Sequence, residues 1–201
     1  MKMTTLDRAL LSITCLLAAY EIVVGIDKLA AAPIIAYTVA FGVLLLAGLL
    51  LIILGFEVLD SPVVVIVSTI IPLSLSLGLV WEYLASYQTP YLVLTIIGFL
   101  AVIVTRSTPM PGKLPTLILT LVHGVAGVII FLLPIVLSVQ GRAGPAFVLV
   151  GIGGALISLD GLLVSFLKTG KPILSRETTL KILPGLWLVM TAAFVAGFRF
   201  G

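Results

Sequence analysis

Residues 33–54, PIIAYTVAFGVLLLAGLLLIIL, form an apolar stretch that contains no charged side chain. A helix of this length can cover the hydrocarbon core of a bilayer, which is roughly 30 Å thick. Within lipid the backbone amides and carbonyls must bond to one another, so only helices and closed barrels can cross. The stretch therefore predicts a transmembrane helix.

Six further apolar stretches follow the same pattern. They cover residues 9–26, 62–81, 90–105, 115–139, 145–167 and 181–198, and we expect the last helix to begin near Ser175. Of the 201 residues, 61% are hydrophobic and only 9% are charged, whereas soluble domains have about 25% charged residues. We therefore expect an all-α fold, a polytopic membrane bundle of seven transmembrane helices. Residues 1–201 are predicted to form a single membrane domain without a soluble domain.

Prolines mark the beginnings of five of these stretches. The fixed φ angle and missing N–H of proline suit the first turn of a helix, which applies to Pro33, Pro62, Pro90, Pro115 and Pro145. Ser61 and Thr89 are the predicted N-caps of two helices. Pro72 and Pro134 lie inside stretches and are expected to kink the third and fifth helices.

The basic residues predict the orientation in the membrane. If all seven stretches cross, one side receives Lys2, Arg8, Arg106, Lys113, Lys168, Lys171, Arg176 and Lys181, and the other receives Lys28, Arg142 and Arg199. The positive-inside rule then places the N-terminus in the cytoplasm and the C-terminus on the opposite side. The net charge of +3 lies in short loops without a basic run, which argues against a nucleic-acid partner. Membrane lipid is the expected partner, and other membrane subunits or a second copy of the chain stay open.

A constant offset of 112 residues suggests an internal duplication. It relates Pro33, Gly42 and Pro72 to Pro145, Gly154 and Pro184. This spacing predicts a 3+1+3 parallel repeat in which the fourth helix inverts the second triplet, as in parallel-repeat transporters. The first and fifth helices do not align in this register, so a chance match is the alternative.

Three helices carry small or polar residues at the spacing i, i+4, i+7, i+11, which places them on one face. The sets are Thr14, Ala18, Glu21 and Gly25; Thr116, Thr120, His123 and Gly127; and Gly154, Ser158, Gly161 and Ser165. Small residues let helices approach closely in lipid, where no hydrophobic effect drives their association. We interpret the glycines and serines as packing seams.

Three ionisable residues within the apolar stretches are the candidates for a transport or proton-linked site. Glu21 lies about 9 Å of helix rise below the outer boundary and should face the bundle interior, because a carboxylate in lipid needs a partner, water or a proton. His123 and Asp160 each lie at a depth of roughly 12 Å on adjacent predicted helices and could pair or relay a proton. Structural hydrogen bonding is the alternative for all three residues.

A second candidate region lies at the outer ends of the helices. Glu21 and Asp27 would there join Trp81, Glu82, Tyr83 and Tyr87, which are the predicted outer-mouth residues. Carboxylates beside aromatic faces suit a cation. The alternative is an aromatic belt at the membrane interface.

Catalytic and cofactor motifs are absent from the sequence. We find no GxSxG, HExxH, P-loop or dinucleotide fingerprint, and Cys15 and His123 are the single residues of their types. One histidine excludes a bis-histidine haem, and a zinc site lacks ligands. No cofactor or metal is expected, and an enzyme acting on lipid is the least favoured function.

Two functional hypotheses follow from these residues. The first is a small transporter or channel for an ion or small solute, with polar residues converging on one cavity. The second is a non-catalytic accessory or structural subunit of a larger membrane complex, with a solid interior.

Overall fold

The computed structural model describes residues 2–26, 29–108, 112–168 and 173–201, without the side chains of Ser165 and Lys168. In these ranges the chain forms seven α-helices and three short 3₁₀ turns, and it contains no strand. The helices are α1 (Thr5–Val24), α2 (Ala31–Leu54), α3 (Pro62–Tyr83), α4 (Gln88–Ser107), α5 (Leu114–Val139), α6 (Val148–Lys168) and α7 (Arg176–Phe200). The 3₁₀ turns are η1 (Phe56–Asp60), η2 (Ala85–Tyr87) and η3 (Pro145–Phe147).

The all-α prediction is confirmed, and several predicted helix starts are corrected. Helix α1 begins four residues early because Thr4 and Asp7 form a capping box, in which each side chain accepts a hydrogen bond from the other residue's amide. Pro62 opens α3, but Pro33 and Pro90 lie at the third position of their helices, and Pro145 opens η3. The N-cap predicted at Thr89 is wrong, because Thr89 lies inside α4.

Two further sequence predictions about helix ends are resolved by the hydrogen bonds. Ser175 caps α7, as predicted, by accepting a hydrogen bond from the Thr178 amide at 3.1 Å. Ser61 occupies the N-cap position of α3, but its side chain makes no capping bond. Pro72 and Pro134 lie inside α3 and α5, as expected, and Pro184 lies inside α7.

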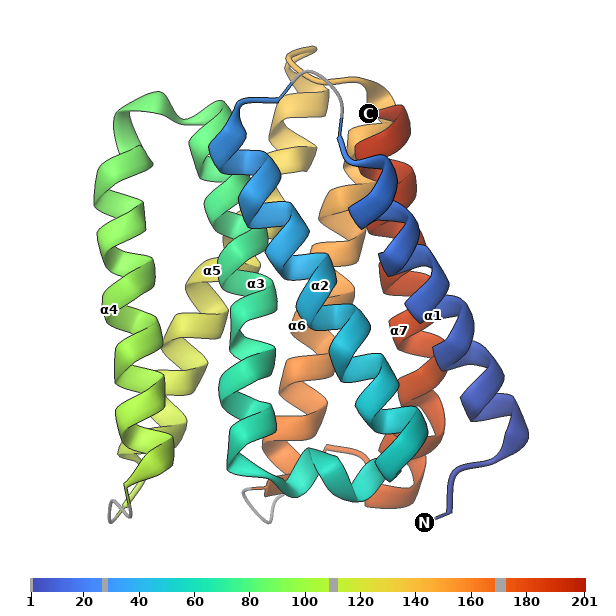
Figure 1. Cartoon of the computed structure of the whole chain (residues 1–201). Helices are drawn as coiled ribbons and strands as arrows, with labels where there is room; N and C mark the ends of the chain where they lie inside the picture. Colours follow the sequence, from blue (N-terminus) through green and yellow to red (C-terminus); the bar gives the residue numbers. More distant parts are fainter. Residues whose placement is uncertain (1, 27–28, 109–111, 169–172) are drawn as a thin grey trace.

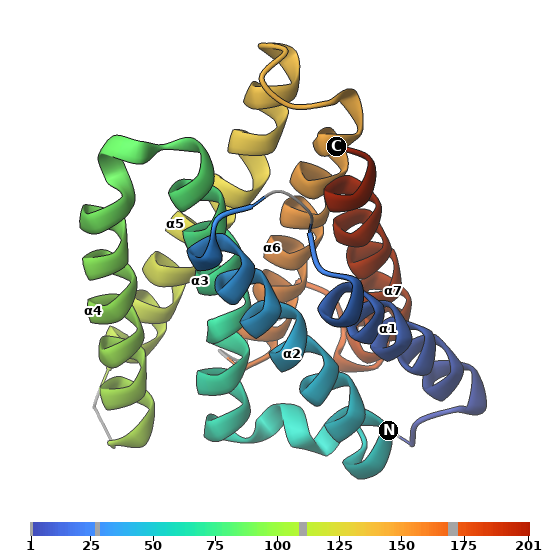
Figure 2. The ribbon, with the colours of Figure 1, turned by 45° about the horizontal axis from the view of Figure 1, so that its top comes forward.

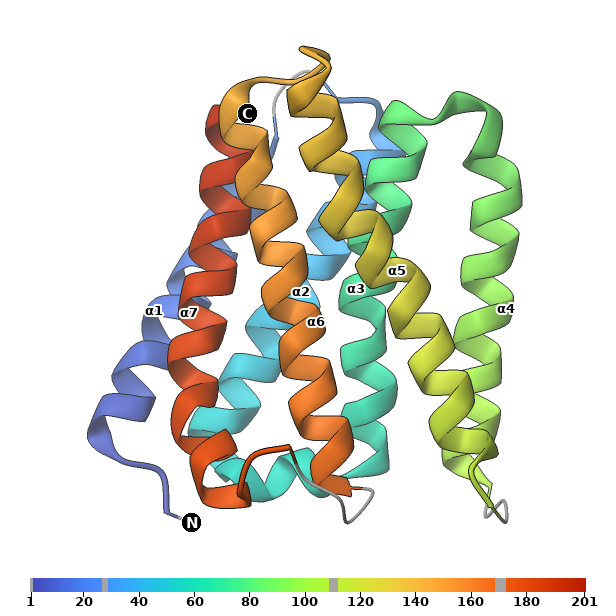
Figure 3. The ribbon, with the colours of Figure 1, turned by 180° about the vertical axis from the view of Figure 1, so that it is seen from behind.

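Six of the helices form a closed ring. Each of α1, α2, α3, α5, α6 and α7 packs against the next in this order, and α7 packs back against α1. Helix α4 lies outside the ring against α3 and α5, at the left edge in Figure 1. Seen from behind, α5 runs obliquely from the end of α4 to the start of α6 (Figure 3). Viewed with its top tilted forward, the bundle shows α1 and α7 side by side on the flank opposite α4 (Figure 2).

The centre of the ring is filled with apolar side chains. Its largest fully buried members come from every part of the ring, including Leu11, Phe41, Leu75, Ile130 and Phe194. The outer surface is also apolar, and α4 and α5 expose many leucines, isoleucines and valines. A bundle that is hydrophobic both inside and outside fits lipid rather than water.

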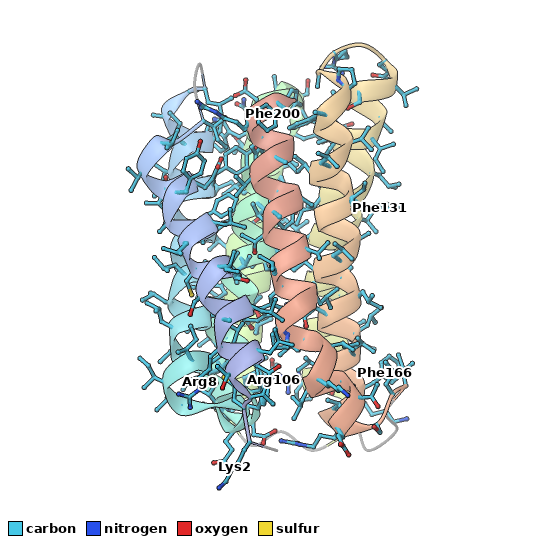
Figure 4. The ribbon with its side chains drawn as sticks, turned by 90° about the vertical axis from the view of Figure 1, so that its right-hand side faces the viewer. Lys2, Arg8, Arg106, Phe131, Phe166 and Phe200 are labelled. Carbon is cyan, nitrogen blue, oxygen red and sulfur yellow. The ribbon has the colours of Figure 1, made fainter. Side chains whose placement is uncertain are left out.

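Six of the seven described helices, α2 to α7, are long and apolar enough to cross a membrane. Helix α1 has 20 residues but carries Asp7, Arg8 and Glu21. The apolar helices indicate a multi-pass membrane protein. The N-terminus and C-terminus lie at opposite ends of the bundle (Figure 1). Lys2, Arg8 and Arg106 lie at the N-terminal end, and Phe200 lies at the other (Figure 4).

Below, the end of the bundle that holds the N-terminus is called the inner end, and the end that holds the C-terminus is called the outer end. Of the described basic residues, Lys113, Arg176 and Lys181 also lie near helix ends at the inner end, whereas Arg142 and Arg199 lie at the outer end. Lys28, Lys171 and the side chain of Lys168 are outside the described part of the chain.

Candidate functional site

Asp160 and Trp187 form a hydrogen-bonded pair between α6 and α7. The indole Nε1 of Trp187 donates to Oδ2 of Asp160 at 3.1 Å. The other carboxyl oxygen, Oδ1, is buried and has no hydrogen-bond partner among the described residues. Because buried polar atoms are nearly always satisfied, an oxygen without a partner indicates a place where water, a proton or a cation can bind.

The structure does not form the predicted pair of His123 and Asp160. Nδ1 of His123 lies 3.2 Å from the carbonyl oxygen of Leu119, one turn earlier on α5. The ring faces α6 next to Gly161, where a built Cβ would lie 4.0 Å from its Cδ2. His123 thus lies beside the residue that follows Asp160, but the Asp160 carboxyl turns to α7 instead.

Glu21 faces the interior of the bundle, as predicted. Its side chain is 5% exposed, and Thr14 and Ala18 on the same face of α1 are fully buried. Glu21 lines a cavity of about 10 Å³ together with Tyr37 and Thr38 of α2. A cavity of this volume is close to the smallest that admits one water molecule. The guanidinium of Arg199, near the end of α7, interacts electrostatically with the Glu21 carboxylate.

Aromatic rings close the outer end of the ring of helices. We call the set Tyr37, Phe41, Tyr83, Phe147 and Phe198 the outer aromatic layer. The rings of Tyr37 and Phe198 pack with centroids 4.6 Å apart, and those of Tyr83 and Phe147 with centroids 5.4 Å apart. Each of these pairs joins the first three helices to α7 or to the turn before α6, so the layer connects the two halves of the bundle.

The predicted outer-mouth residues separate into different environments. Tyr83 belongs to the outer aromatic layer, and it and Glu82 interact electrostatically with the buried Tyr37. Trp81 is partly buried and its carbonyl accepts a hydrogen bond from Gln88, whereas Tyr87 is 62% exposed. Among the described residues no ring contact joins Trp81 or Tyr87 to the layer, and Asp27 lies outside these residues.

At the inner end an ion pair and a cavity lie between the two halves of the bundle. Nη2 of Arg176 lies 2.8 Å from Oδ2 of Asp60, which joins the start of α7 to η1. A cavity of about 70 Å³ opens beside this pair and is also lined by Leu59, Val164, Leu167 and Leu180. Its volume is several times what one water molecule needs.

The small residues of α6 pack against α5, which confirms their interpretation as a packing seam. A Cβ built on Gly154 would lie 2.7 Å from the backbone of Ile130, and one built on Gly127 would lie 2.5 Å from the Ser158 hydroxyl. That hydroxyl donates to the Gly154 carbonyl at 2.8 Å. The set predicted on α5 does not share one buried face, because Thr120 is exposed. Ser165 lies outside the side chains that the structure describes.

Sequence reasoning missed Trp187, Tyr37 and the Asp60–Arg176 pair. Trp187 is separated from Asp160 by 27 residues and lies on another helix, so no local pattern links the two. A usable signal was the spacing of Leu180, Pro184 and Trp187 at i, i+4 and i+7, which predicts that they share one face of α7.

Loss of the indole hydrogen bond gives a test of the Asp160–Trp187 pair. Replacing Trp187 with phenylalanine should lower the free energy of unfolding by about 1–2 kcal/mol, because the Asp160 carboxyl then loses its donor while staying buried. Adding Asp160→Leu should recover part of this loss, since the carboxyl is then absent. Unfolding in detergent micelles measures both effects, with Trp81→Phe as the control. A loss no greater than in the control would contradict the importance of the bond.

Compared with models of known protein families, with curated proteins and with solved structures, the chain shows no significant match.

Proposed function

We propose that this protein is a small transporter or channel that carries a proton or a small cation across the membrane, with Asp160 and Glu21 as the groups that bind it. The observation that carries the proposal is Oδ1 of Asp160, a buried carboxyl oxygen without a partner among the described residues. An ionised carboxylate in a low-dielectric interior costs several kcal/mol unless it is compensated. Binding of a proton or a cation removes that cost.

Asp160 and Glu21 lie at different depths in this pathway. Asp160 is about 12 Å of helix rise from the inner end of α6, and Glu21 lies beside a cavity near the outer end. In the proposed mechanism each carboxylate binds the moving species in turn. His123, whose ring lies next to Gly161, is the third ionisable group close to Asp160 and would influence its charge.

The closures at both ends support an occluded state. The outer aromatic layer and a hydrogen bond of 3.4 Å from Arg142 to the Tyr83 carbonyl close the outer end. The Asp60–Arg176 pair joins the same two halves at the inner end. Transport would require these contacts to open alternately, as in carriers that rock one half of the bundle against the other.

The arrangement of neighbours is compatible with the internal repeat. Exchanging α1, α2 and α3 for α5, α6 and α7 leaves every neighbour relation of the ring unchanged, and α4 then acts as the linker. Pro72 and Pro184, which the offset of 112 residues relates, both lie inside their helices. We include this 3+1+3 plan, seven membrane crossings and a cytoplasmic N-terminus in the proposal.

A second candidate function is a non-catalytic accessory subunit of a larger membrane complex. The observation that favours it is the tightly filled interior, since the cavities beside Glu21 and beside Arg176 measure only about 10 and 70 Å³. In this case the exposed face of α4 would contact another membrane subunit, and the buried carboxyls would serve only for packing and hydrogen bonding.

Flux measurements in liposomes distinguish the two functions. We expect the wild-type protein to carry protons, Na⁺ or K⁺ down an imposed gradient faster than protein-free liposomes do. Glu21→Gln should reduce this flux because the amide cannot ionise, whereas the exposed Glu57 at the inner end provides the control variant Glu57→Gln. Flux of all three ions at the protein-free level would contradict transport and favour the accessory subunit.

A further inference from the structure

The cavity at the inner end leads towards Asp160. Its walls include Val164 of α6 and Leu180 of α7. Asp160 is four residues from Val164, and Trp187 is seven residues from Leu180, so each lies on the same helix face as the wall residue. On α6 the separation is about one turn, or 5.4 Å. The cavity therefore ends close below the Asp160–Trp187 pair.

Polar atoms without their usual partners lie along this route. Pro184 has no N–H, so the carbonyl of Leu180, which lies on the cavity wall, lacks its helical donor. The hydroxyl of Thr179 is fully buried and has no hydrogen-bond partner among the described residues, and the same holds for Oδ1 of Asp160. Buried water typically makes two to four hydrogen bonds to such groups.

We propose that the cavity between η1, α6 and α7 is a water-filled entrance through which Asp160 exchanges protons with the inner end of the bundle. The Asp60–Arg176 ion pair lies at its rim and restricts access. That the exchanged species is a proton rests on the proposed function. The entrance itself rests on the cavity and on the unpartnered oxygens above it.

The side chains at the rim suit a gate that opens readily. Arg176 and Asp60 are 56% and 55% exposed, and an exposed ion pair contributes at most about 1 kcal/mol. Such a pair can break and re-form without loss of the fold. By contrast, the outer aromatic layer buries several large rings, so we expect the inner end to admit water more easily than the outer end.

Cysteine labelling tests the entrance directly and does not depend on flux. In a Cys15→Ala background, Leu180→Cys places a thiol on the cavity wall and Asp160→Cys places one at its end. Leu183→Cys on α7 and Leu163→Cys on α6 are the matched controls, because both leucines are buried in the packed interior. Reaction with iodoacetamide in reconstituted vesicles is followed by mass spectrometry, and unfolding midpoints establish that each variant is folded.

We expect the thiols at positions 180 and 160 to react at least about tenfold faster than those at positions 183 and 163, because the reagent attacks a thiolate that water can reach. Adding Arg176→Gln should accelerate both reactions further. Equally slow labelling at all four positions would overturn the entrance, and unchanged rates with Arg176→Gln would overturn the gate. Fast labelling in a protein without flux would leave the entrance in place and contradict only the proposed transport, whereas flux with slow labelling would do the reverse.

Discussion

Proton or cation flux through the Asp160→Asn protein is expected to fall by at least about 100-fold, to the level of protein-free liposomes, because a positioned ionisable group contributes about that much to proton transfer. Asparagine has nearly the same shape as aspartate, and its Oδ1 can still accept the hydrogen bond from Trp187. It cannot ionise, however, and therefore cannot take up and release the transported species. The variant thus separates charge from packing.

Two measurements make this result interpretable. The unfolding midpoint of the Asp160→Asn protein should stay close to that of the wild type, which would show that the loss of flux is not a loss of fold. Glu177→Gln removes a carboxylate that is exposed at the start of α7 and should leave the flux unchanged. Undiminished flux in a folded Asp160→Asn protein would exclude Asp160 from the pathway.

The second large effect concerns Gly154, where α5 and α6 come into close contact. A Cβ at this position would lie 2.7 Å from a backbone carbon of Ile130 and 2.8 Å from the Phe131 nitrogen. Backbone cannot move aside as a side chain can, so the two helices would have to separate. We expect Gly154→Val to lower the free energy of unfolding by about 3 kcal/mol, at the upper end of the usual cost of overpacking.

The chain contains a matched control for this substitution. Gly42 corresponds to Gly154 under the offset of 112 residues, and a Cβ there would meet nothing within 4 Å. Because glycine is a poor helix former, Gly42→Val should leave the stability unchanged or raise it by less than about 1 kcal/mol. Unfolding in detergent micelles compares the two variants, and similar losses in both would show that close packing at Gly154 is not the cause.

The contrast between these glycines also limits what an internal repeat can explain. Matching positions in the sequence suggested equivalent surroundings, yet Gly154 contacts a neighbouring helix and Gly42 does not. A repeat therefore describes the order of the helices better than it describes the contacts of individual residues. The seam between α5 and α6 could be recognised from its spacing of small residues, but the partner of that seam could not.

The helices themselves could be predicted well from local properties. Long apolar stretches predicted every α-helix, and Ser175 was recognised as the N-cap of the last one. The errors were local as well. Thr89 was assigned as an N-cap because it precedes a proline, but the helix begins earlier after the turn η2. The inward direction of Glu21 followed from the cost of a carboxylate in lipid, and it is confirmed by its 5% exposure.

The partners of the polar residues could not be predicted. Depth alone placed His123 and Asp160 at the same level, but depth does not determine which faces of two helices meet. In the structure His123 bonds within its own helix, while Asp160 bonds to Trp187 on a third helix.

By itself the sequence determined that the chain forms long apolar helices, because membrane compatibility depends on hydropathy averaged over about 20 consecutive residues. It also determined that buried charges need partners. Only the tertiary structure decided what those partners are, how the ring of six helices closes and where its cavities lie. These features depend on the rotation and tilt of each helix against its neighbours, which arise from packing between residues far apart in the chain.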